Sequence, residues 1–96
     1  MKLLFYLKRG TQDKNGKSPI MGRISIGRSM VQFSCKCACT PNLWDSRKQR
    51  LVGKSAEAVS VNNELDRLQV SVCKVYEMLL KKSNVSVRAE QVKELV

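Results

Sequence analysis

The sequence predicts an α+β fold in which a three-stranded antiparallel β-meander packs on one long α-helix, with the start of a further helix at the C-terminus. Three observations carry this prediction. Apolar and polar residues alternate with the period of two that is typical of strands through much of the first 40 residues. After residue 55 apolar residues recur at spacings of three and four, as on one face of a helix. A chain of 96 residues with 43% hydrophobic residues also suits one small domain and is too apolar for a disordered basic tail.

The three strands are separated by recognisable turn signals. Residues 3–7 form a short apolar and aromatic run, which favours a strand. The polar segment that follows contains Asn15-Gly16, a strong turn signal. Residues 19–27 place isoleucines at alternating positions, and residues 30–40 alternate cleanly between apolar or cysteine residues and polar ones. Two hairpins would join these strands into an antiparallel meander.

The third strand should end at Pro41, because proline cannot donate a hydrogen bond to a sheet ladder. The following connector, residues 45–54, is basic and is expected to be irregular. Trp44 follows Leu43 in an otherwise polar context. We interpret Trp44 as a plug that closes one end of the core; stacking on a nucleic-acid base is the alternative.

One long helix is predicted from Ser55, its N-cap, to residues 81–82, with Ser83-Asn84 ending it. About 28 residues at about 1.5 Å each give about 42 Å, whereas a strand of eight residues reaches only about 26 Å. We therefore expect the helix to overhang the sheet around residues 73–82, where it needs another partner. A second helix is predicted to start near Ser86 as its N-cap.

The positive charge of the chain is confined to its first half. The formal net charge is +10. Residues 1–54 hold 12 of the 18 Lys and Arg residues and only two of the eight acidic ones, whereas residues 55–96 hold six of each. This division indicates that the N-terminal half faces a polyanion, for which nucleic acid is the commonest candidate.

If one helix covers one face of the sheet, parity assigns the side chains of both faces. The residues expected to face the helix are Leu3, Phe5, Leu7, Ile20, Ile24, Ile26, Val31, Phe33, Cys35 and Cys37. The opposite, open face would carry cations, hydroxyl and amide groups, one aromatic ring and no acid: Lys2, Leu4, Tyr6, Lys8, Met21, Arg23, Ser25, Gln32, Ser34 and Lys36. An ordinary solvated face is the alternative, but such faces normally mix charges of both signs.

The open face has the chemistry of a surface that docks in the major groove of DNA, which admits a β-ribbon. Arg23 could donate two hydrogen bonds to guanine and Gln32 could pair with adenine, while the lysines and Arg28 would meet phosphates. The predicted DNA-binding residues are Tyr6, Lys8, Lys14, Lys17, Arg23, Ser25, Arg28, Gln32, Ser34 and Lys36.

Nothing in the sequence indicates catalysis. The chain has no histidine, so an imidazole base is excluded, and neither Tyr6 nor Tyr76 has a visible base or oxyanion partner. We therefore predict no catalytic residues, no cofactor and no small-molecule substrate. No run of about 20 apolar residues suggests a membrane span, and no secretory signal is recognisable, so we expect a cytoplasmic protein with reduced thiols.

The cysteines at 35, 37 and 39 invite a metal site, with Cys73 as a fourth ligand. Alternate residues of a strand are about 6.6 Å apart, which is too spread for one ion without a bend. Zinc sites usually bring their thiolates together on a tight turn. We therefore predict that these residues pack in the core and bind no metal.

Several segments stand in a familiar order: residues 4–9 (LFYLKR), 15–20 (NGKSPI), 22–26 (GRISI), and 41–50, which contain PNLWDS and KQR. Together with the Gly-Lys-Ser start of the long helix, they resemble the N-terminal arm-type DNA-binding domain of tyrosine recombinases, the integrases of phages and conjugative transposons. The resemblance covers residues 2 to about 95. The chain departs from the family pattern at the Cys-Lys-Cys of the third strand, and its hairpin at residues 27–30 is less typical.

The resemblance implies a noncatalytic module that binds double-stranded DNA, its sheet docked in the major groove at arm-type attachment sites during integration and recombination of a mobile element. It implies that residues 1–84 are the arm-type domain and residues 85–96 a linker and the truncated start of a core-binding domain. The remaining core-binding and catalytic domains of the parent integrase would be partners. Two alternatives stay open: a double-stranded RNA-binding module, and a protein-interaction module that uses the helix around residues 72–80.

Overall fold

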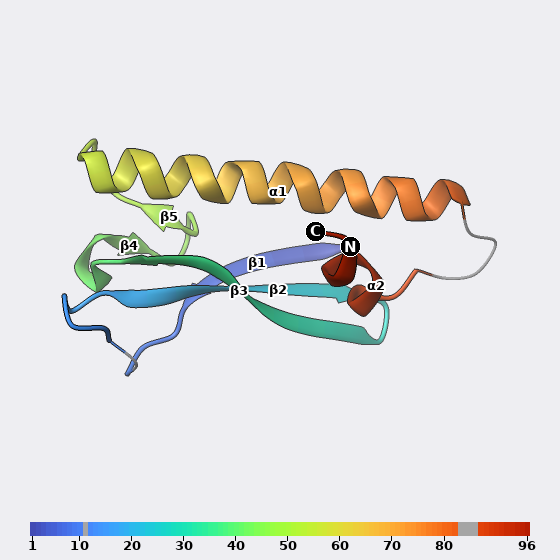
Figure 1. Ribbon diagram of the computed structural model, residues 1–96, viewed down its shortest axis with the longest axis horizontal. Helices are drawn as coiled ribbons and strands as arrows, with labels where there is room; N and C mark the ends of the chain where they lie inside the picture. Colours follow the sequence, from blue (N-terminus) through green and yellow to red (C-terminus); the bar gives the residue numbers. More distant parts are fainter. Residues whose placement is uncertain (11, 83–86) are drawn as a thin grey trace.

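The computed structural model describes residues 1–10, 12–82 and 87–96. It contains a three-stranded antiparallel sheet in the order β1-β2-β3, with α1 running along one face (Figure 1). The elements are β1 (Lys2–Leu7), β2 (Ser18–Ile26), β3 (Ser29–Cys39), the 3₁₀ turn η1 (Pro41–Leu43), β4 (Trp44–Asp45), β5 (Arg50–Leu51), α1 (Ala56–Lys82) and α2 (Ala89–Leu95). The predicted α+β meander with one long helix and a second short helix is therefore confirmed.

Local side-chain hydrogen bonds close the loop between β1 and β2 at the predicted turn. The carboxylate of Asp13 accepts the backbone N–H groups of Asn15 at 2.8 Å and Lys17 at 3.0 Å. The N–H of Gly16 donates to the carbonyl of Asp13, and Gly16 has a φ of 75°, which glycine adopts without steric cost. Ser55 caps α1 as predicted, because its hydroxyl accepts the N–H of Ala58 at 3.2 Å.

The ladder between β2 and β3 is interrupted by a bulge that the alternating sequence does not reveal. Pro19 pairs with Ala38 and Met21 with Ser34, so three residues of β3 stand opposite Ile20. Lys36, at the middle of the bulge, has a φ of 58°, in the left-handed region. Two extra residues leave the parity of the strand unchanged, so Cys39 is still buried on the helix side.

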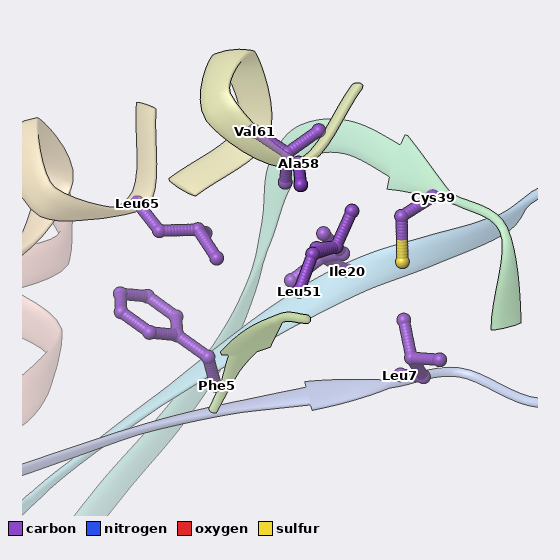
Figure 2. Packing of buried hydrophobic residues seen from close by; sticks show 8 residues of the cluster. All are labelled: Phe5, Leu7, Ile20, Cys39, Leu51, Ala58, Val61 and Leu65. Atoms are coloured by element: carbon purple, nitrogen blue, oxygen red, sulfur yellow. The ribbon is translucent and has the colours of Figure 1, made fainter. Parts of the chain in front are cut away.

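All ten residues predicted to face the helix do so. One cluster joins the N-terminal half of α1 to the sheet and to β5; Figure 2 shows its side chains converging from these elements. Its buried members are Phe5, Leu7, Ile20, Cys39, Leu51, Ala58, Val61 and Leu65. Leu3, Cys35, Cys37 and Trp44 pack against them, as the interpretation of Trp44 as a core residue predicts.

The C-terminal half of α1, which was expected to need a further partner, packs against α2. Ile24 and Val72 are buried together with Val87, Ala89 and Val92, which places α2 between α1 and the sheet (Figure 1). The hydroxyl of Ser29 accepts the N–H of Ala89 at 2.9 Å, which ties the start of α2 to the β2–β3 turn.

The position of α2 corrects one detail of the sequence analysis. The helix begins at Ala89 with Arg88 at its N-cap position, later than a start capped by Ser86 would place it. Ser86 itself lies outside the described residues, as does the expected end of the first helix at Ser83-Asn84. The assignment of residues 85–96 to a following domain stays a prediction, although Val87, Ala89 and Val92 share a hydrophobic cluster with the sheet.

Candidate nucleic-acid interface

The open face of the sheet is organised in rows that cross all three strands. Strand register puts neighbouring side chains of one row on the same face. The rows are Lys2–Ser25–Met30, Leu4–Arg23–Gln32 and Tyr6–Met21–Ser34. Five of the residues predicted to contact DNA therefore share one surface: Tyr6, Arg23, Ser25, Gln32 and Ser34.

Arg23 occupies the middle of this face. It lies on the central strand between Leu4 and Gln32, and the same residues line a recess together with Tyr6 and Trp44. Its Nε atom is buried, and no described residue accepts a hydrogen bond from it. Within residues 1–10, 12–82 and 87–96, no acid forms an ion pair with Arg23. The terminal NH2 groups of Arg23 also have no hydrogen-bond partner among the described residues. Because Arg23 lines the open recess, these groups can donate to an acceptor from outside the chain.

Four other predicted cations lie toward the two ends of these three rows. Lys8 and Lys14 are exposed around the β1–β2 loop, Arg28 is exposed at the β2–β3 turn, and Lys36 is exposed in the bulge. Figure 1 places this loop and this turn at opposite ends of the sheet. No ion pair holds any of these four side chains in the described part of the chain.

Lys17 differs from the other predicted contacts because it already has a partner. Its Nζ atom lies 3.2 Å from a carboxylate oxygen of Glu57 at the start of α1, and the Thr40 hydroxyl donates to the same carboxylate at 3.1 Å. Desolvation raises the pKa of Glu57, but hydrogen bonds from Lys17 and Thr40 outweigh it and leave that pKa lowered. Lys17 therefore links the start of β2 to α1.

The connector after β3 is more ordered than the sequence analysis expected. The segment predicted to be irregular contains a two-stranded hairpin, in which Trp44 pairs with Leu51 and Asp45 with Arg50. Trp44, Ser46 and Gln49 line the same recess as Arg23. The residue that could have indicated this hairpin is Asp45, because aspartate favours turns. Its carboxylate accepts the N–H of Arg47 at 2.9 Å, as in an Asx turn.

The three cysteines of β3 pack in the core as predicted, whereas Cys73 does not. Cys39 is buried, Cys35 and Cys37 are half-buried, and Cys73 is exposed on α1. Among the described residues, no group of three or more His, Cys, Asp or Glu is arranged to hold a metal ion. Burial, assisted by the neighbouring Cys37, raises the pKa of Cys35 to about 12. Burial is the main cause that raises the pKa of Cys39 to about 11, and the negative charge of Glu57 is the second.

These positions predict selective thiol chemistry. At pH 8 a thiol-alkylating reagent should modify Cys73 first and leave Cys35 and Cys39 largely unmodified, because the thiolate is the reactive form and their raised pKa values keep both thiols neutral. Mass spectrometry of digested protein after timed labelling measures each site. Denatured protein, in which all four cysteines should react, is the control. Equal labelling of Cys35 and Cys73 in the folded protein would contradict the placement.

A family model matches most of this chain. Among the described residues, no helix is long and apolar enough to cross a membrane. Comparison with curated proteins and with solved structures finds no significant match. The sequence model of the arm DNA-binding domain matches residues 5–93. This range includes the connector hairpin, α1 and the whole three-stranded sheet apart from the first residues of β1. The chain therefore belongs to the arm DNA-binding domain family.

Proposed function

We propose that this chain binds double-stranded DNA sequence-specifically through the open face of its sheet, at arm-type attachment sites. In this proposal it is the noncatalytic N-terminal module of a cytoplasmic integrase of the tyrosine recombinase type, which integrates or recombines a mobile element. The core-binding and catalytic domains of that integrase would be its partners. The observation that carries the proposal is the acid-free open face with Arg23, unpaired within the described residues, at its centre.

Each group on the face has a role in this proposal. Arg23 donates two hydrogen bonds to a guanine, and Gln32 offers an amide to adenine. The hydroxyls of Tyr6, Ser25 and Ser34 add single hydrogen bonds to bases or phosphates. The exposed cations around the sheet neutralise phosphates: Lys8, Lys14, Arg28 and Lys36. Lys17 joins them only if it gives up its ion pair with Glu57.

Salt dependence of binding tests whether DNA is held in this way. The logarithm of the association constant should fall linearly as the logarithm of the salt concentration rises. Four phosphate contacts predict a slope of about −3.6, and further contacts make it steeper. The probe is a labelled 20-base-pair duplex selected from a random library by the protein itself, and fluorescence anisotropy measures the binding. A slope near zero would contradict electrostatic binding to the DNA backbone.

An RNA duplex separates the proposal from double-stranded RNA binding. The major groove of A-form RNA is deep and narrow, so the sheet should not enter it. An RNA duplex of the selected sequence should therefore compete poorly with the labelled DNA, and equal competition would favour the RNA-binding alternative.

A further inference from the structure

The connector hairpin, residues 44–51, is fixed to the edge of the sheet and to α1 by side-chain hydrogen bonds. The Gln49 side-chain oxygen accepts the N–H of Phe5 at 2.8 Å, on the free edge of β1. The Asn62 side chain, on α1, accepts the N–H of Leu51 at 2.8 Å and donates to its carbonyl at 3.1 Å. The hairpin is thus held from both sides.

Arg50 adds a third attachment to the same hairpin. Its guanidinium donates to Asp66 at 3.0 Å and to Gln69 at 2.8 Å, and it lies 5.2 Å from the centre of the Phe5 ring. Because its guanidinium is already engaged, Arg50 is not counted among the cations available to bind DNA. Its contacts hold the hairpin against both β1 and α1.

The tip of the hairpin, Ser46-Arg47-Lys48, is exposed and cationic. The adjacent carboxylate, Asp45, accepts the backbone N–H groups of Arg47 at 2.9 Å and Lys48 at 3.2 Å. No ion pair or side-chain hydrogen bond engages either cation within the part of the chain that the structure describes. The braced turn therefore presents two cationic side chains that form no ion pair within the described fold, while the Asp45 carboxylate is engaged by the backbone of the turn.

Ser46 joins this tip to the open face, and Lys48 lines a hollow at the outer edge of β1 with Phe5 and Arg50. Trp44, Ser46 and Gln49 line one recess together with Arg23 and Gln32, so the surface continues from the middle of the sheet onto the hairpin. A three-stranded sheet is about 10 Å wide, from two strand spacings of about 4.8 Å. The major groove is about 12 Å wide. If the strands run parallel to the major groove, the sheet nearly fills its width. An element just beyond the edge strand then contacts the sugar–phosphate backbone at the border of the groove.

We propose that the tip of the connector hairpin binds this sugar–phosphate backbone, with Arg47 and Lys48 as phosphate ligands and Ser46 as a hydroxyl donor. The inference rests on the proposed function and extends it, because it assigns a second, sequence-independent contact beside the sheet. A phosphate contact made by a braced turn fixes the position of the duplex against Arg23 and Gln32. A loop that only solvates the edge of the sheet would not require this bracing.

The experiment compares Arg47→Ala/Lys48→Ala with wild-type protein on the selected 20-base-pair duplex and on a duplex of random sequence. With six phosphate contacts, a rise from 50 to 200 mM salt should weaken wild-type binding about 2,000-fold; with four contacts the variant should lose only about 150-fold. Its slope should thus be smaller by about 1.8 on both duplexes.

Lys81→Ala/Lys82→Ala is the matched control, because it removes the same charge from the exposed C-terminal end of α1. Its slope should stay near the wild-type value. Equal slopes for the two double variants would overturn the inference. Thermal unfolding verifies that both variants fold, as expected for exposed side chains. If wild-type binding does not depend on salt, the proposed function itself is contradicted. If the wild-type slope is steep and both variants share it, only the hairpin contact is contradicted and the proposed function stands.

Discussion

Replacing Gly22 with alanine should lower the free energy of unfolding by about 1–3 kcal/mol, the usual cost of overpacking a core. Gly22 is buried in the central strand opposite Phe33. A β-carbon at this position would lie 2.4 Å from Cζ of Phe33 and 2.8 Å from both Cε atoms. Glycine usually weakens a strand, so its place here is explained by the close approach of the ring. The added methyl group would displace that ring from its contacts with Ile24 and its neighbours.

Urea denaturation of four variants measures this effect: Gly22→Ala, Ser25→Ala, Phe33→Leu and Gly22→Ala/Phe33→Leu. Ser25→Ala is the control in the same strand, because its side chain faces away from the core; it should change stability by no more than about 0.5 kcal/mol. Gly22→Ala/Phe33→Leu should recover part of the loss, because leucine leaves room for the new methyl group. If Gly22→Ala is as mild as Ser25→Ala, or if the two core changes simply add, the ring does not require a glycine.

The faces of the sheet could be predicted because side-chain parity is a local property of each strand. Ile24 and Phe33 alternate with polar residues, and Phe5 has the same parity as Leu3 and Leu7 within an apolar run. The structure puts all three on the helix side. The bulge at residues 35–37 could not be predicted in this way. It inserts two residues, so the alternation of the sequence continues through it without a phase change.

The connector hairpin and the ion pair of Lys17 depend on contacts between residues far apart in the sequence. Gln49 binds the backbone of Phe5, 44 residues away, and Lys17 binds Glu57. The strands of the hairpin have two residues each, too short for a recognisable period. The sequence could therefore place cations in the N-terminal half, but it could not separate those engaged in the fold from those that remain exposed.

The start of α2 shows the same limit at the other end of the chain. Ser86 has the chemistry of an N-cap, but the helix begins at Ala89. The N–H of Ala89 is bound by Ser29, a residue 60 positions earlier, and Val92 is buried against the sheet and α1. Tertiary packing decides where such a short helix starts, because a helix of seven residues has little stability of its own.

Arg23 should determine sequence discrimination more than any other residue of the open face. On the selected duplex, Arg23→Ala should weaken binding by about 1–3 kcal/mol, or about 5- to 150-fold, because the variant cannot make the proposed bidentate contact to a base. On a random duplex the loss should be much smaller. Lys14→Ala is the comparison: an exposed cation that meets phosphate should weaken binding to both duplexes equally and reduce the salt slope by about 0.9.

Arg23→Lys separates the shape of the guanidinium from its charge. Lysine keeps the positive charge and much of the half-buried aliphatic stem, but it lacks the planar fork that pairs with a guanine edge. This variant should bind the random duplex as tightly as wild-type protein and lose most of its preference for the selected one. Anisotropy titrations on both duplexes at one salt concentration give the ratio directly. An unchanged ratio in Arg23→Lys, or equal losses on both duplexes in Arg23→Ala, would show that Arg23 contacts phosphate and that the sequence is read by other residues of the face.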